Sequence, residues 1–163
     1  MINSISLIGM AGAGKSSVGK ELSKMLGFTF IDSDDLIEAK YGKNLQEILD
    51  DEGYIQLRKI ENFIIKDIHF DKTILSTGGS AVYSNEAMAH IQKNSSVIFL
   101  DVPFNQILER VPSFLERGFA KAPSQSIEDA FTERQKLYQT YSHYRVSNAK
   151  DLDSCVTKII ELF

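Results

Sequence analysis

A glycine-rich loop near the start of the chain has the residue types that bind phosphate groups. Residues 9–16 read Gly-Met-Ala-Gly-Ala-Gly-Lys-Ser and match the pattern G-x-x-x-x-G-K-[ST] at each fixed position, directly after the apolar segment 5–8. Glycines let successive backbone N–H groups converge on one point, and a helix that begins near Lys15 directs the positive end of its dipole there. We therefore expect Lys15 to reach the β- and γ-phosphates of a nucleotide, and the Ser16 hydroxyl to bind the Mg²⁺ that bridges them.

The match over this whole loop, between a strand pattern and a helix pattern, favours a nucleotide site over a turn that binds nothing. The residues predicted to hold the nucleotide phosphates are Gly12, Ala13, Gly14, Lys15, Ser16 and Ser17.

A cluster of carboxylates follows the next apolar segment, residues 28–31. A carboxylate near nucleotide phosphates can hold Mg²⁺, or it can accept the proton of an attacking hydroxyl. Asp32 and Asp34 are two residues apart, so in extended chain their side chains point in different directions and could divide these two roles. The alternative is a set of acids that favours a helix N-terminus by about 0.3–1 kcal/mol through the helix dipole, and we assign that role to Asp35.

Four arginines lie in segments that could reach such a site. Arg58 and Arg134 stand in predicted helices, and each taken alone reads as a solvated charge. Arg110 and Arg117 flank or occupy residues 111–125, which contain Pro, Gly and Ser without periodicity and are predicted to form a mobile loop. Arginines on such a loop indicate a lid that closes over a transferring phosphoryl group, or else a surface loop of ordinary charge.

Hydrophobic periodicity predicts strands that alternate with helices. Buried strands are predicted at 5–8, 28–31, 73–75 and 97–101, with an edge strand at 144–147. Helices are predicted at 15–26, 36–41, 45–51, 55–68, 85–92, 103–110, 127–144 and 154–163. This alternation is typical of an α/β fold whose parallel sheet is covered on both faces. Parallel strands end at one edge, so the phosphate loop, the acids and the turn 76–80 should meet there.

Composition and charge limit the classes of partner. The chain has 163 residues, 43% of them hydrophobic and 25% charged, which fits one globular domain over residues 1–163. A formal net charge of -4 argues against a nucleic-acid or anionic-membrane partner. The N-terminus lacks a signal-peptide pattern, and no segment approaches the ~18 apolar residues of a membrane span. The lone Cys155 excludes an internal disulfide, suits a reducing compartment and is expected in the core, so we predict a cytoplasmic protein. As separate expectations, we predict a monomer and a small-molecule substrate.

The ordered set of motifs resembles shikimate kinase over essentially the whole chain. The phosphate loop alone is shared by many unrelated proteins, and the full set is much more specific. The matching pieces are Gly9 to Ser16, Leu26-Gly27, Asp32-Ser33-Asp34, Glu52-Gly53, Leu57 to Glu61, Ser76 to Gly79, Phe99 to Pro103 with Arg110, and Glu133-Arg134 before Leu137-Tyr138.

The resemblance implies a three-layer P-loop kinase fold, with a central five-stranded parallel sheet flanked by helices and a mobile lid. It implies transfer of the γ-phosphoryl group of ATP to the 3-hydroxyl of shikimate, a step in aromatic amino-acid biosynthesis, with Mg²⁺ as the metal. By position, Asp34 would contact the substrate hydroxyls and act as base or orienter, and Asp32 with Ser16 would bind the metal. Arg58 and Arg134 would grip the substrate carboxylate, for which the guanidinium fork is suited. The remaining assignments are Gly78, Gly79 and Ser80 beside the substrate, Arg117 as the lid arginine on the phosphates and Arg110 against the adenine.

Two positions depart from the family pattern. The turn usually carries three glycines, and here the third is Ser80, whose side chain either crowds the acceptor or offers it a hydroxyl. The lid usually reads Arg-Pro-Leu, and here it reads Arg117-Gly118-Phe119, so we expect a looser hinge at a cost of about 0.4–1 kcal/mol on closing. Both departures keep open a related kinase that acts on another small hydroxy acid or polyol.

Three other classes are less favoured. A nucleoside monophosphate kinase would need a nucleobase-reading segment between the second and third strands. A GTPase would need Asn-Lys-x-Asp, which Asn148 to Asp151 does not match. A non-catalytic nucleotide-binding module is disfavoured by the intact Lys15, Ser16, Asp32 and Asp34.

Overall fold

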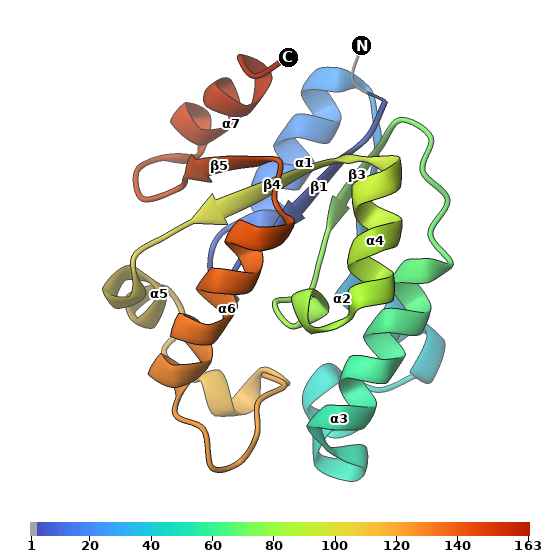
Figure 1. Ribbon diagram of the computed structural model, residues 1–163, viewed down its shortest axis with the longest axis vertical. Helices are drawn as coiled ribbons and strands as arrows, with labels where there is room; N and C mark the ends of the chain where they lie inside the picture. The colour runs from blue at the N-terminus through green and yellow to red at the C-terminus, as the bar shows by residue number, and fades with distance from the viewer. Residues whose placement is uncertain (1–2) are drawn as a thin grey trace.

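The computed structural model describes residues 3–163, with the side chains of all of these except Leu115. Its centre is a parallel sheet of five strands in the order β2-β3-β1-β4-β5 (Figure 1). The strands are β1 (Ile5–Ile8), β2 (Thr29–Asp32), β3 (Thr73–Ser76), β4 (Ser96–Asp101) and β5 (Tyr144–Ser147). In register, Ile5 of β1 pairs with Ile74 of β3 on one side and with Ser96 of β4 on the other. The predicted five-stranded parallel sheet is confirmed.

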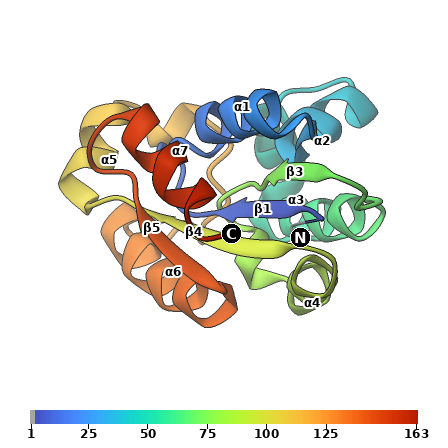
Figure 2. The ribbon, with the colours of Figure 1, turned by 90° about the horizontal axis from the view of Figure 1, so that it is seen from above.

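Helices cover the sheet on both faces, which gives three layers (Figure 2). The helices α1 (Lys15–Leu26) and α7 (Leu152–Ile160) lie on one face, and α4 (Asn85–Asn94) and α6 (Ile127–Tyr141) on the other. The helix α5 (Phe104–Arg110) follows β4, and α2 (Ser33–Tyr41) packs against α3 (Leu45–Lys66). Two short 3-10 helices, η1 (Ala81–Tyr83) and η2 (Phe114–Glu116), lie in the connections.

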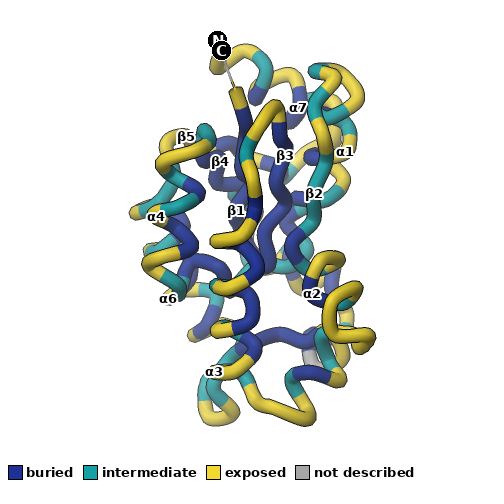
Figure 3. Tube along the Cα trace, turned by 90° about the vertical axis from the view of Figure 1, so that its right-hand side faces the viewer, coloured by how far each residue is buried: buried dark blue, intermediate teal, exposed yellow. Residues whose placement is uncertain are grey.

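The central strands are buried because apolar residues fill both of their faces. Figure 3 shows β1 and β3 in the colour of buried residues, and all four residues of each are buried. Strands buried on both faces are typical of parallel sheets. The strand predicted at 28–31 forms, but the prediction that it is buried is wrong. β2 pairs only with β3 at the sheet edge, so Thr29 is exposed and the other three residues are partly buried.

Local capping explains where several helices begin and end. Asn44 accepts a hydrogen bond from the Glu47 backbone, and the Glu47 side chain accepts one from Asn44 N, so the two residues form a capping box. Gly53 leaves the helical conformation at φ 82°, so α3 is broken there, as the sequence predicts. α6 ends at Tyr141 and not at 144, because the chain turns at Ser142 to enter β5.

The core contains Cys155, as predicted, and burial raises the pKa of its thiol to about 11. Within residues 3–163, no helix has both the length and the apolar composition that crossing a bilayer requires.

Candidate active site

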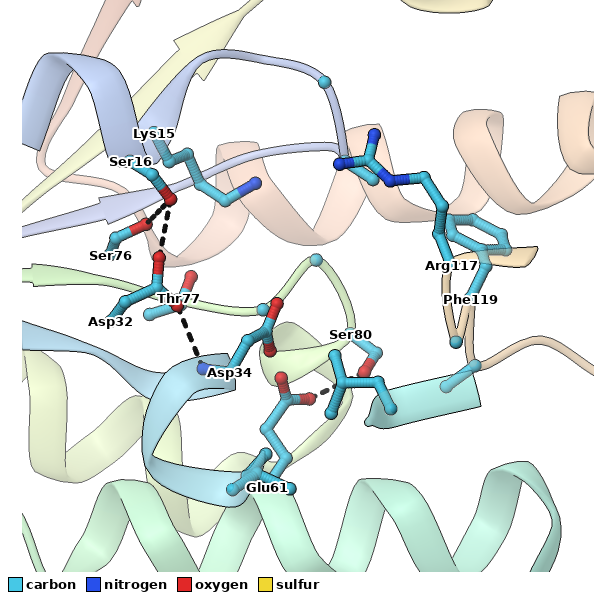
Figure 4. A pocket seen from close by; sticks show the side chains of 18 of the residues that line it. Lys15, Ser16, Asp32, Asp34, Glu61, Ser76, Thr77, Ser80, Arg117 and Phe119 are labelled. Atoms are coloured by element: carbon cyan, nitrogen blue, oxygen red, sulfur yellow. Dashed lines mark hydrogen bonds between the residues drawn. The ribbon is translucent and has the colours of Figure 1, made fainter. Parts of the chain in front are cut away.

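A cavity of about 260 Å³ opens at the edge of the sheet where the strands end (Figure 4). The phosphate loop, the acids after β2, the turn after β3, α6 and the lid segment 111–125 all contribute to its wall. Parallel strands deliver their carboxyl ends to this edge, so segments far apart in the sequence meet in one place. Of the residues predicted for the site, those that line the cavity are Gly12, Gly14, Lys15, Ser16, Ser17, Asp32, Asp34, Gly78, Gly79, Ser80, Arg117 and Arg134.

The phosphate loop adopts the backbone that its glycines permit. Gly12 and Gly14 have φ values of 82° and 90°, and α1 begins at Lys15, directly after the loop. Lys15 Nζ donates hydrogen bonds to Gly9 O and Met10 O, both at 2.8 Å. Burial lowers the pKa of Lys15 to about 8, although Asp34, Asp32 and Glu61 favour the charged form. The ammonium therefore stands at the mouth of a loop shaped to receive an anion.

Asn148, which follows β5, supports this loop from outside. Its Nδ2 donates to Ala13 O at 2.7 Å, and a methyl group on Gly14 would lie 2.5 Å from the same nitrogen. Arg110 is exposed beside it and donates to Asn148 O at 2.8 Å and to Gly12 O at 3.3 Å. Asn148 could not be predicted as a site residue, because no local pattern connects it to a loop at the opposite end of the chain.

Replacing Asn148 with Ala should weaken ADP binding about fivefold, since one buried hydrogen bond contributes about 1 kcal/mol. The loop would lose the donor to Ala13 O, while the cavity side stays unchanged. Calorimetric titration with MgADP measures the change. Asn94→Ala, which removes a hydrogen bond to His90 O at an exposed position, is the control and should leave the affinity unchanged. Equal affinity of both variants would contradict a supporting role for Asn148.

Hydroxyl and carboxylate oxygens meet beside the phosphate loop, as Figure 4 shows. Ser16 Oγ donates to Asp32 Oδ2 at 2.5 Å and lies 3.3 Å from Ser76 Oγ. Asp32 Oδ1 accepts a hydrogen bond from Asp34 N at 3.0 Å and so caps α2. Asp32 thus caps the helix with Oδ1 and accepts the hydrogen bond of Ser16 with Oδ2. Mg²⁺ in phosphate-transfer sites is usually bound by one or two carboxylates together with phosphate oxygens and water, so this donor set fits it.

Asp34 and a second carboxylate, Glu61 of α3, both lie against the same side of Gly78. A methyl group on Gly78 would overlap Glu61 Oε2 and lie 2.7 Å from Asp34 Oδ1. Burial, then the charges of Glu61 and Asp32, raise the pKa of Asp34 to about 7. Burial also raises the pKa of Glu61, which is 3% exposed. Only glycine leaves room at position 78. Burial, together with the neighbouring carboxylates, gives Asp34 the pKa of a base that works near neutral pH.

Glu61 is part of the family motif, but no role was predicted for it. In the structure it lines the wall of the cavity. Its side-chain Oε1 accepts a hydrogen bond from Ser80 Oγ at 2.6 Å. Ser80 is buried, so its hydroxyl is directed at Glu61 rather than presented freely to an acceptor.

Arg134 and Arg58 meet at one carbonyl group. Arg134 is 1% exposed, which rules out the solvated-charge interpretation, and its Nη2 donates to Ala120 O at 2.7 Å. Arg58 is partly buried and donates from Nη2 to the same oxygen at 2.9 Å. Among the described residues, the buried Nε atoms of both arginines have no hydrogen-bond partner. Buried donors that lack a partner are costly, so the pair is suited to binding an anion.

Aromatic rings support the two guanidinium groups. The Arg134 guanidinium lies 4.0 Å from the centroid of the Phe119 ring, and that of Arg58 lies 3.7 Å from the Tyr83 ring. Such stacking favours the charged form of a guanidinium that has lost water. Tyr138 donates from its hydroxyl to Gly79 O at 2.6 Å, which fixes the turn after β3 beneath the arginines.

The lid segment 111–125 lies against α3 in this structure. Gly118 N donates to Gln46 Oε1 at 2.8 Å, and a methyl group on Gly118, whose φ is 64°, would overlap the Leu45 side chain. Gly118 is therefore required for close packing on α3, which is a different role from the looser hinge that the sequence suggested. Figure 4 shows the Arg117 side chain reaching across the cavity mouth toward the phosphate loop. The mobility of the lid stays a prediction.

Comparison with known proteins agrees with the fold and the motifs. The family model described as shikimate kinase matches residues 11–163. The shikimate kinase of Aquifex aeolicus is 32% identical over 157 residues, which cover 96% of this chain and 93% of that protein. The shikimate kinase of Francisella tularensis subsp. holarctica is 36% identical over 160 residues, 95% of this chain and 91% of the relative.

A solved structure is similar over nearly the full length. Shikimate kinase from Acinetobacter baumannii, in complex with shikimate, superposes with a TM-score of 0.89 at 27% identity and covers 99% of this chain and 93% of its own. The sequence model, the relatives and the superposition agree, and the chain belongs to the shikimate kinase family.

Proposed function

We propose that this protein transfers the γ-phosphoryl group of ATP to the 3-hydroxyl of shikimate. The observation that carries the proposal is the convergence of three groups on one cavity. These groups are the phosphate loop with Lys15, the carboxyl of Asp34 and the guanidinium of Arg134. A shikimate complex of the Acinetobacter baumannii relative supports shikimate as the acceptor.

Each end of the acceptor would meet a complementary group. The carboxylate of shikimate would bind the arginine pair, whose Nε donors lack partners among the described residues. The hydroxyls would face Asp34, and the backbone of Gly78 and Gly79 would lie beside the ring. During transfer the acceptor oxygen bonds to the γ-phosphorus, its proton passes to Asp34, and ADP leaves with the bridging oxygen.

Lys15 and Arg117 would stabilise the charge on the phosphates as it develops. Lys15 stands at the phosphate loop, and Arg117 reaches over the cavity from the lid (Figure 4). Positive charge placed in advance at a transferring phosphoryl group is a main source of acceleration in such reactions. Ser16 and Asp32 would hold Mg²⁺, which neutralises charge on the β- and γ-oxygens when bound. Arg110, beside the phosphate loop, would lie against the adenine.

The cytoplasmic location, the monomeric state, the single domain over residues 1–163 and the lack of nucleic-acid or membrane partners stay predictions from composition and charge.

Release of ADP from ATP should depend on Mg²⁺ and be strongly stimulated by shikimate. A coupled assay with a panel of hydroxy acids and polyols measures kcat/KM for each acceptor. Quinate, which has a similar ring and carboxylate, and gluconate serve as comparison compounds. A much higher kcat/KM for any compound other than shikimate would assign the protein to a different acceptor, which is the alternative that Ser80 and Phe119 kept open.

A further inference from the structure

Ser80 stands where the family pattern usually has glycine. Among the described residues, the hydrogen-bond partner of its hydroxyl is Glu61. Ser80 Oγ donates to Glu61 Oε1 at 2.6 Å, and both residues are buried. A glycine here would leave Glu61 without this donor. The bond therefore distinguishes this chain from the usual form of the turn, at the wall of the cavity that receives the acceptor.

The two oxygens of Glu61 have different surroundings. Oε1 is held by Ser80, while Oε2 lies over Gly78, close to the position of Asp34 Oδ1. Figure 4 shows the same arrangement, with Glu61 between Ser80 and Asp34. The hydroxyl thus fixes the rotation of the carboxyl group and directs its free oxygen toward Asp34.

The positive charge of Arg134 reaches this carboxyl group and lowers its pKa, against the effect of burial. A methyl group on Gly79 would lie 3.3 Å from Arg134 Nη1, and the adjacent Gly78 is the residue that Glu61 Oε2 overlies. Opposite charges that are buried attract each other more strongly than exposed ones. Among the residues that the structure describes, however, Glu61 forms no ion pair with Arg134 or Arg58. The hydrogen bond that Glu61 does form with a side chain is the one from the Ser80 hydroxyl.

We infer that Ser80 is a positioning residue. It holds Glu61 toward Asp34 and so keeps the donors of Arg134 available to the carboxylate of the acceptor. The inference rests on the proposed function, because it takes an acidic acceptor as the ligand of the arginines. Without the hydroxyl, Glu61 turns toward Arg134 and competes with the acceptor for the same donors.

Steady-state kinetics of Ser80→Ala, Ser80→Gly and Ser80→Thr test the inference, with shikimate and ATP varied in turn. Loss of a hydrogen bond to a charged group should raise KM for shikimate about tenfold in the Ala and Gly variants, with KM for ATP changed less than about twofold. The Thr variant keeps a hydroxyl and should return KM for shikimate to within about threefold of the original. Thermal unfolding of each variant separates this effect from a loss of folding.

A double variant with Glu61→Gln supplies the sharper comparison. Glutamine cannot form an ion pair with Arg134, so adding Ser80→Ala in the Glu61→Gln background should change KM for shikimate less than about twofold. An effect of Ser80→Ala that persists in this background, or that falls equally on KM for ATP, would overturn the positioning role. If the original enzyme does not phosphorylate shikimate, the proposed function fails. If it does and Ser80→Ala leaves KM for shikimate unchanged, only the present inference fails.

Discussion

Replacing Asp34 with Asn should lower kcat by about 10²–10⁴-fold, the usual contribution of a general base, while the Kd for ATP changes less than about threefold. Asparagine keeps the size of the side chain and cannot accept the proton of the acceptor hydroxyl. Asp34 faces Gly78 and Glu61 at the acceptor side of the cavity, so its loss spares the phosphate loop. Single-turnover phosphoryl transfer and calorimetric titration with a non-hydrolysable ATP analogue measure the two quantities.

The same substitution should raise thermal stability at pH 8. The pKa of Asp34 is about 7 in the folded protein and lies near 3.8 in the unfolded chain, so folding favours the protonated form. The stabilisation that the protonated Asp34 carboxyl contributes is fully present below pH 3.8, and it is lost as the pH rises through about 7. Asn removes the ionised form, and the gain in Tm should be larger at pH 8 than at pH 5.

Asp35→Asn is the matched control for both measurements. Asp35 is exposed in the first turn of the same helix, so its replacement should leave kcat and the pH dependence of Tm nearly unchanged. If Asp34→Asn lost ATP binding, or kept normal turnover, its place as the base would be contradicted.

Replacing Arg134 with Lys should raise KM for shikimate about 30-fold, which corresponds to about 2 kcal/mol for a buried charge pair with reduced hydrogen bonding. Lysine keeps the charge but lacks the planar fork and the stacking on Phe119 that the guanidinium provides. KM for ATP should change little, because the phosphate loop is a separate wall of the cavity.

Arg145→Lys is the control for the arginine substitution. Arg145 forms an exposed ion pair with Asp101, so this variant should behave like the original enzyme. Since Arg134 is deeply buried, thermal unfolding must accompany the kinetics. A folded Arg134→Lys enzyme with unchanged kcat/KM for shikimate would remove Arg134 from acceptor recognition.

Local patterns sufficed for the parts of the site that lie within one segment. The phosphate loop is contiguous, and Asp32 and Asp34 directly follow the residues of an apolar strand, so both could be placed from the sequence. The parallel sheet followed from the alternation of strands and helices. The edge position of β2 could not be predicted, because the strand order depends on long-range pairing and not on the composition of Phe30 and Ile31.

The burial of Arg134, Glu61 and Asn148 depended on contacts between distant segments. Arg134 stands in a polar stretch of α6 and is buried because Phe119 and Ala120 of the lid cover it. Glu61 is buried where α3 meets the turn after β3. Such contacts leave no periodic signal in either partner. Local patterns therefore indicated a solvated charge for Arg134 and no role for Glu61 and Asn148, and it was the family resemblance that placed Arg134 at the acceptor.

The packing of Gly118 has a consequence for engineering by comparison with relatives. Restoring the family's usual proline at this position would normally count as a stabilising exchange toward consensus. Here proline could not adopt the φ of 64°, would overlap Leu45 and would remove the N–H that Gln46 accepts. The lid and the start of α3 are thus matched to each other in this chain. A transplant of the proline lid should succeed only when positions 45 and 46 are exchanged with it.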